Sequence, residues 1–203
     1  MPNPASDLAN NFVAHIRTLE ITRHKIEGLL QTGYLDREDA EQVYCGLYLN
    51  VFTEFEGLIE ELFFGLLSST IVSPNAVCVV PPSSSALAQQ ILMIGKSYLD
   101  WLPYDKTLER ANIIFQDGRP FSLLQHNHKE KLLQFIKIRH VIAHKSNHAK
   151  QQFERGVIGT LTLLPRERTP VGFLMSRFRT NPVQTQYELV IQELESMAQL
   201  LCH

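Results

Sequence analysis

Arginine and histidine side chains gather in the stretch FIKIRHVIAHKSNH, residues 135–148. Arg139 and His144 lie five positions apart, and His140 follows the arginine directly. A guanidinium group offsets negative charge that builds on a phosphate, and an imidazole that titrates near neutral pH transfers a proton. Phosphodiester cleavage requires both kinds of group. Arg139, His144 and His140 are therefore the candidate catalytic residues.

The charge of the chain is unevenly distributed. The 203 residues have a formal net charge of −2, yet residues 126–179 hold eleven Lys or Arg and three acids, a formal charge of +8. The remaining residues carry −10 by the same count. Such asymmetry favours one surface for a polyanion such as RNA, although a solvated basic loop is the alternative interpretation. The candidate RNA-binding residues are Lys137, Lys145, His148 and Lys150.

Length and composition are typical of one globular domain over residues 1–203, with 44% hydrophobic and 20% charged residues. No apolar run reaches the ~18 residues that a membrane helix needs, and the first residues lack the pattern of a secretory signal. Cys45, Cys78 and Cys202 are scattered and odd in number, which argues against a disulfide framework. We therefore expect a cytoplasmic protein without a membrane partner.

Hydrophobic periodicity predicts an all-α protein, a bundle of about five to six helices. Helix-capping residues, glycines and prolines predict helices at 6–31, 36–69, 84–101, 105–115 and 183–201. A further helix, which carries the Arg–His motif, begins at 127 or 128 and passes through 143, and the sequence does not fix its end near 146. The second helix has the widest apolar stripe, so we expect it at the centre of the bundle. Its three glycines, Gly46, Gly57 and Gly65, predict close packing of neighbouring helices.

Residues 156–180 have a different texture. The segments 157–164 and 171–178 have β-branched, alternating character, and residues 165–170 join them with two prolines and two arginines. This pattern predicts a small β-hairpin near 157–178, inserted into the helical protein.

The stretch from Arg139 to His144 resembles the motif of the HEPN superfamily, whose members carry an arginine and a histidine with four to six residues between them on a late helix. His140 matches the polar residue usual after the arginine, and Ala143 matches the small residue common before the histidine. Residues 48–59, with Glu56, are similar to the long upstream helix that carries an acidic residue. Ser146 stands where members paired with a nucleotidyltransferase antitoxin often have tyrosine.

The resemblance implies a metal-independent endoribonuclease without a cofactor, typically a toxin of a toxin–antitoxin system or a phage-defence effector. It also implies a homodimer whose two motifs face each other, and a possible antitoxin or defence partner protein. In the expected reaction, His144 removes a proton from a ribose 2′-hydroxyl, which attacks the adjacent phosphorus while Arg139 stabilises the charge.

Helical geometry separates the candidate residues. Residues five apart lie ~140° apart around a helix, whereas His140 and His144, four apart, share a face. We therefore expect one chain to aim Arg139 and His144 at one phosphate poorly, and a second copy to improve the arrangement.

Three alternatives remain open at this point. In the first, Arg139 would form an ion pair with an acidic helix and His144 would be a hydrogen-bonded core histidine. In the second, the chain would be a non-catalytic HEPN-like module that binds RNA or protein. The third is a metal site, because His140 and His144 have the spacing of helical zinc ligands. That site would lack the carboxylate of the HExxH motif and any cysteine close in sequence.

Overall fold

The computed structural model describes residues 2–93 and 99–203 of the chain, which divides into two compact units. Four helices pass from one unit into the other, so the single domain expected over 1–203 stays a prediction. Unit 1 comprises Met1–Val13, Glu54–Leu132 and Glu195–His203, and unit 2 comprises Ala14–Thr53 and Leu133–Leu194.

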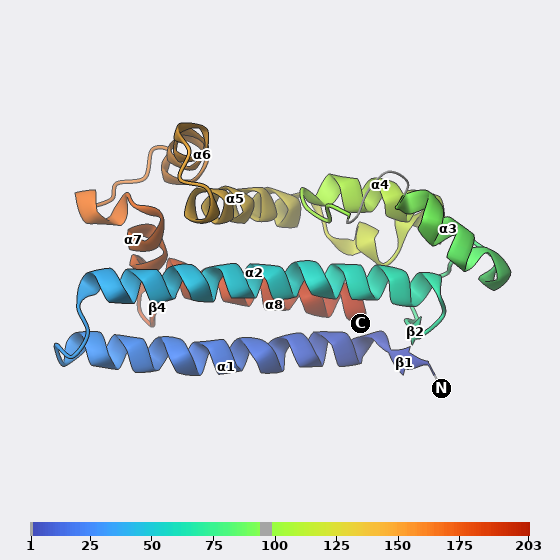
Figure 1. The fold of residues 1–203 in the computed structure, drawn as a ribbon, viewed down its shortest axis with the longest axis horizontal. Helices are drawn as coiled ribbons and strands as arrows, with labels where there is room; N and C mark the ends of the chain where they lie inside the picture. The colour runs from blue at the N-terminus through green and yellow to red at the C-terminus, as the bar shows by residue number, and fades with distance from the viewer. Residues whose placement is uncertain (1, 94–98) are drawn as a thin grey trace. The chain divides into compact units, whose positions relative to one another are not determined.

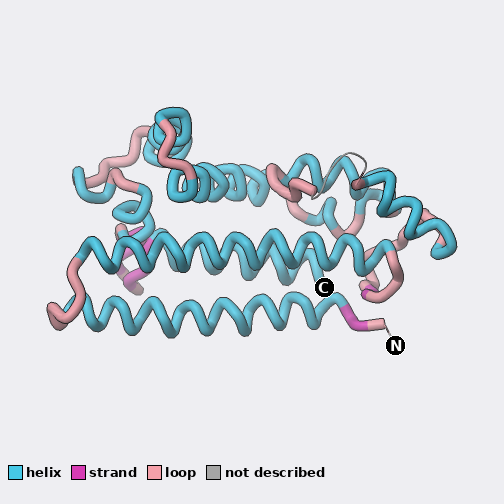
Figure 2. Tube along the Cα trace, viewed as in Figure 1, coloured by secondary structure: helices cyan, strands magenta, loops and turns pink. Residues whose placement is uncertain are grey.

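The described residues are mostly helical, which confirms the all-α prediction (Figures 1 and 2). The described part has eight α-helices rather than five to six, because the short helices α6 and α7 were not expected. The long helices are α1 (Ala5–Gln31), α2 (Arg37–Leu67), α5 (His126–Ala143) and α8 (Gln186–Cys202), and the shorter ones are α3 (Ser85–Leu92), α4 (Tyr104–Ile114), α6 (Asn147–Phe153) and α7 (Pro170–Met175).

The start of α2 follows from its capping residue. The backbone N–H of Asp39 donates to Asp36 Oδ1 at 2.8 Å, which satisfies a donor that the first helical turn leaves unpaired. Gly33, with φ of 75°, turns the chain between α1 and α2. Both boundaries agree with the sequence prediction, and α2 ends at Leu67, two residues before the predicted end.

The predicted strands of the β-hairpin are wrong, although a hairpin is present. Strand β3 (Arg177–Thr180) pairs antiparallel with β4 (Val183–Thr185), so the last helix begins at 186 rather than 183. The predicted first strand instead holds the end of a π-helical turn, Glu154–Ile158, and the second forms most of α7. Thr169 accepts from the Gly172 N–H at 3.0 Å with Pro170 at the first helical position. These start signals outweigh the β-branched pattern.

The third helix is shorter than predicted. Helix α3 ends at Leu92, residues 94–98 of the predicted helix lie outside the described residues, and Trp101 is not helical. Pro103 disfavours helical geometry at the residue before it. The Trp101 indole is buried and donates to Glu60 Oε2 at 2.8 Å, so packing within unit 1 fixes this segment in a non-helical form.

Aromatic rings form the core of unit 1. The Phe63 ring lies 5.1 Å from Trp101, 5.1 Å from Phe115 and 5.3 Å from Phe121, measured between ring centroids. Gly65 lets β2 (Ile71–Val72), which pairs with β1 (Asn3–Pro4), pack closely on α2, because a Cβ there would collide with Ile71. The close packing predicted at Gly46 and Gly57 is wrong, since a Cβ at either position would meet nothing within 4 Å.

A buried arginine joins α1 to α8 in unit 2. Arg23 is 2% exposed and donates to Glu20 at 2.9 Å, to Glu27 at 2.6 Å and to Glu188 at 2.8 Å. The Tyr44 hydroxyl of α2 also donates to Glu27. Three helices of unit 2 therefore share one hydrogen-bonded ionic cluster.

Candidate functional site

Packing within unit 2 fixes the helix that carries the Arg–His motif. The hydroxyl of Tyr48, fully buried on α2, donates to the backbone oxygen of Phe135 at 2.9 Å. Phe135, Ile138 and Val141 are buried along α5. The buried side therefore sets the rotation of α5 and leaves His140 and His144 exposed to solvent.

Helices α5 and α6 line a groove of about 350 Å³ in unit 2. Three of the histidines, one lysine and two further polar side chains line it together with apolar residues. The lining residues are Leu133, Ile136, Lys137, His140, His144, Ser146, His148, Ala149 and Gln152. The groove thus gathers four residues proposed from the sequence for catalysis or RNA binding, which are Lys137 and His140 on α5, His144 directly after α5, and His148 on α6.

The His140 and His144 rings lie 6.1 Å apart between centroids, with their planes at 65°. Both side chains are exposed and line the same groove, as the four-residue spacing predicts. The alternative that His144 is a core histidine is wrong, because its side chain reaches solvent. Both imidazoles are accessible to a ligand in the groove.

Arg139 lies outside the set of residues that line this groove. Its side chain is half-buried on α5, and residues five apart lie ~140° apart around an ideal helix, so its absence from the face of His140 is expected. One chain therefore does not gather the arginine and the histidines in a single groove.

The four candidate RNA-binding residues divide into two pairs. Lys137 and His148 line the groove, whereas Lys145 and Lys150 are exposed outside it. Lys137 passes so close to Gly156 in the π-helical turn that a Cβ there would collide with its ammonium group. Gly156 thus leaves the space in which the Lys137 side chain lies.

Helix α6 supplies groove residues that the sequence did not point to. Ser146 has extended backbone geometry, and its hydroxyl accepts from the Ala149 N–H at 3.2 Å, which starts a new helix after α5 ends. Ser146 and Gln152 line the groove together with His148. Serine is a common capping residue, so Ser146 could have indicated the start of a new helix, but the sequence prediction left the end of the preceding helix undefined near this residue.

The pKa of His140 lies below its ordinary value of 6.5. The imidazole is open to solvent on one side, and its partial burial on the other is the main cause of the lowered pKa, followed by the positive charge of Arg139 and the neighbouring His144. His140 is therefore neutral at pH 7, and a neutral imidazole accepts either a proton or a hydrogen bond.

We expect the His140 imidazole to titrate with a midpoint below the ordinary histidine value of about 6.5. In the variant His144→Ala the midpoint should rise, because one of the groups that lower the pKa is removed. NMR titration of the imidazole protons in both proteins measures the two midpoints. A midpoint above 6.5 in the parent protein, or no rise in the variant, would contradict this electrostatic description of the groove.

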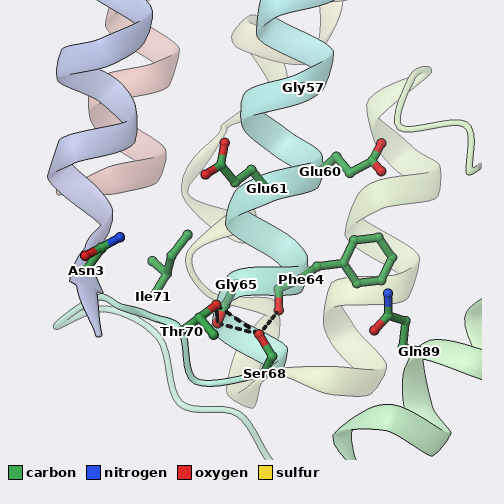
Figure 3. A pocket seen from close by; sticks show the side chains of 10 residues that line it. All are labelled: Asn3, Gly57, Glu60, Glu61, Phe64, Gly65, Ser68, Thr70, Ile71 and Gln89. Atoms are coloured by element: carbon green, nitrogen blue, oxygen red, sulfur yellow. Dashed lines mark hydrogen bonds between the residues drawn. The ribbon is translucent and has the colours of Figure 1, made fainter. Parts of the chain in front are cut away.

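A separate hollow of about 580 Å³ lies in unit 1, beside the C-terminal part of α2 (Figure 3). Glu60 and Glu61 line it and point to opposite sides of the helix. At the lower edge of the hollow, the Ser68 hydroxyl donates to the Phe64 carbonyl oxygen at 2.7 Å. Two carboxylates and no basic side chain line this hollow, so it does not suit a polyanion.

No family model matches the chain, and neither a curated protein nor a solved structure matches it. Within residues 2–93 and 99–203, no three or more His, Cys, Asp or Glu side chains are grouped so that they could hold a metal ion. No described helix is long and apolar enough to cross a membrane. The functional assignment therefore depends on the groove and its residues.

Proposed function

We propose that this protein is a metal-independent endoribonuclease of the HEPN type, with His144 as its proton-transfer group. The observation that carries the proposal is the groove on α5 and α6, where His140, His144 and His148 are accessible beside Lys137. The groove belongs to the segment of +8 formal charge, which suits a polyanionic substrate. The motif's resemblance to HEPN ribonucleases supports the same assignment.

The proposed reaction uses the ribose as the nucleophile. His144 takes the proton of a 2′-hydroxyl, the 2′-oxygen forms a bond to the adjacent phosphorus, and the bond to the 5′-oxygen breaks. A second imidazole gives its proton to the leaving 5′-oxygen, and Arg139 offsets the charge on the non-bridging oxygens. The products are a 2′,3′-cyclic phosphate and a 5′-hydroxyl. His140 orients His144 or binds the phosphate.

Two copies of the chain complete the proposed site. Because Arg139 lies outside the groove of its own chain, we propose a homodimer in which Arg139 of a second copy reaches the groove. The second imidazole, which protonates the leaving group, comes from the same groove as the first, where His140 and His148 also lie. A cyclic dimer places the same residues on both sides of its axis, so it contains two equivalent composite sites.

We expect two inactive variants to restore each other's activity when mixed. Arg139→Ala and His144→Ala are purified separately, mixed in equal amounts under conditions that exchange subunits, and assayed for RNA cleavage. After random exchange, half of the dimers are heterodimers, and each heterodimer has one intact composite site where the parent dimer has two. About a quarter of parental activity should therefore return. Each variant unfolded and refolded alone is the control. No recovery in a mixture shown to contain heterodimers would contradict the composite site.

The biological setting follows from the resemblance. We propose a toxin or phage-defence effector whose activity is held in check by an antitoxin or another defence protein. A non-catalytic RNA-binding module is the second candidate, and the position of Arg139 outside the groove favours it. Such a module would bind RNA through Lys137 and the histidines, and neither the parent protein nor any mixture of variants would cleave it.

A further inference from the structure

The hairpin β3–β4 of unit 2 presents an aromatic ring between two arginines. All four residues of β3 are exposed, and the Phe178 side chain is 49% exposed between Arg177 and Arg179. Residues 177–185 contain no acidic side chain. A large apolar ring beside two cations, without a carboxylate on the same hairpin, is a feature that core packing does not explain.

Phe178 is the extra residue of a β-bulge. Arg177 pairs with Thr185 and Arg179 pairs with Gln184, so no β4 residue lies opposite Phe178. A bulge interrupts the strict alternation of side chains and redirects the residue that it adds. In a regular strand, the Phe178 ring would lie on the face opposite to Arg177 and Arg179. The bulge removes this constraint on the direction of the ring.

The base of the hairpin is anchored. Gln184 is buried, and its side-chain amide donates to Gln192 of α8 at 2.7 Å. The Gln186 N–H donates to the Ser176 carbonyl oxygen at 3.0 Å, which closes the hairpin. Glu188 accepts from the Thr185 N–H at 2.7 Å at the start of α8. A fixed base holds β3 in place, so little ordering is needed when a ligand binds to its exposed side chains.

We propose that this hairpin binds unpaired bases of single-stranded RNA, with one base stacked on Phe178 and the flanking phosphates contacting Arg177 and Arg179. Aromatic rings next to cations are the side chains on which proteins stack unpaired bases, and arginine also contacts phosphate. The positive charge of the hairpin complements a polyanion.

The proposal names the substrate class for the proposed ribonuclease, and it rests on that function. Base faces are stacked against each other inside a duplex and are open to a phenyl ring only in single strands or loops. We therefore expect single-stranded RNA to be favoured over double-stranded RNA, with the preference coming from this hairpin rather than from the groove.

The test measures binding of a fluorescent 2′-O-methyl oligonucleotide, which lacks the free 2′-hydroxyl that cleavage requires. The variants are Phe178→Ala, Phe178→Trp and the double variant Arg177→Gln/Arg179→Gln. The control is Tyr34→Ala, because Tyr34 is an exposed aromatic residue outside the basic segment, residues 126–179. Losing one stacked base should weaken single-strand binding about tenfold to a hundredfold in Phe178→Ala. Phe178→Trp and Tyr34→Ala should bind like the parent, and duplex binding should not depend on Phe178.

The outcomes separate this proposal from the proposed function. If Phe178→Ala binds single strands as tightly as the parent, the hairpin proposal is overturned even when the parent cleaves RNA. If the affinity falls as expected but the parent never cleaves RNA, the hairpin proposal holds and the ribonuclease assignment fails. If Phe178→Ala changes the oligomeric mass and leaves RNA affinity unchanged, the hairpin is an interface between copies, and RNA binding there is excluded.

Discussion

Replacing His144 by alanine is expected to lower the RNA cleavage rate by ~10²–10⁴-fold, the usual contribution of a positioned acid–base group. The variant loses the imidazole that takes the 2′-hydroxyl proton but keeps Arg139, Lys137 and the basic segment. RNA affinity should therefore change little. Because the His144 side chain is exposed, the melting temperature should also stay close to that of the parent.

A matched control lies at the opposite end of α5 from His144, which directly follows this helix. His126 is in the first turn of α5, in unit 1, and its side chain is 87% exposed near Glu130, outside the groove. His126→Ala should cleave at the parental rate. The measurements are cleavage rate, RNA affinity and melting temperature for both variants. A His144→Ala protein that melts normally and still cleaves as fast as the parent would end the assignment of catalysis to this motif.

The second large effect concerns stability. Arg23→Met should lower the free energy of unfolding by about 3 kcal/mol, because removing one partner of a buried ion pair leaves uncompensated charge. The carboxylates of Glu20, Glu27 and Glu188 would then face one another without the guanidinium group. They remain 23–27% exposed, so water moderates the loss, which places it at the lower end of the range for such clusters.

The state of Glu188 strengthens this expectation. Burial by itself would raise the pKa of Glu188, but hydrogen bonds from Thr185 and the charge of Arg23 hold it below its ordinary value. Glu188 is therefore ionised at neutral pH. Tyr187 contributes to the same cluster, since its ring centroid lies 5.8 Å from the Arg23 guanidinium carbon.

Arg37→Met is the matched control for stability. Arg37 donates to Glu41 at 2.8 Å on the exposed side of α2, and exposed pairs of this spacing are worth ~0.3–0.5 kcal/mol. Urea denaturation of the parent and both variants at pH 7 gives the three free energies. Equal losses for Arg23→Met and Arg37→Met would show that the Arg23 cluster does not stabilise unit 2.

The long helices were predictable from the sequence because their signals are local. The Asp36 cap, the apolar stripe of α2 and the glycine after α1 all act within a few residues. The strands of the hairpin were misplaced for a local reason as well: the capping Thr169 and the following Pro170 outweigh a β-branched pattern that favours strand. Trp101 leaves its predicted helix because of contacts with distant residues such as Glu60, which no local pattern shows.

The candidate site was predictable only in part. The shared face of His140 and His144 follows from their spacing, and so does the separation of Arg139 from His144. The contribution of α6 depended on recognising that Ser146 starts a second helix. Arg23 showed no sign of burial in the sequence, because its partner Glu188 is 165 residues away.

The most direct test of the ribonuclease assignment is an analysis of cleavage products. Pure protein is incubated with RNA and with DNA of the same sequence, each with and without EDTA, and the ends of the fragments are identified. We expect that RNA is cleaved and DNA is not, because the 2′-hydroxyl is the nucleophile. EDTA should not change the cleavage rate, because Arg139 supplies the positive charge. The fragments should carry 2′,3′-cyclic phosphate and 5′-hydroxyl ends. Cleavage of DNA, loss of activity in EDTA, or 5′-phosphate ends would contradict the proposed mechanism.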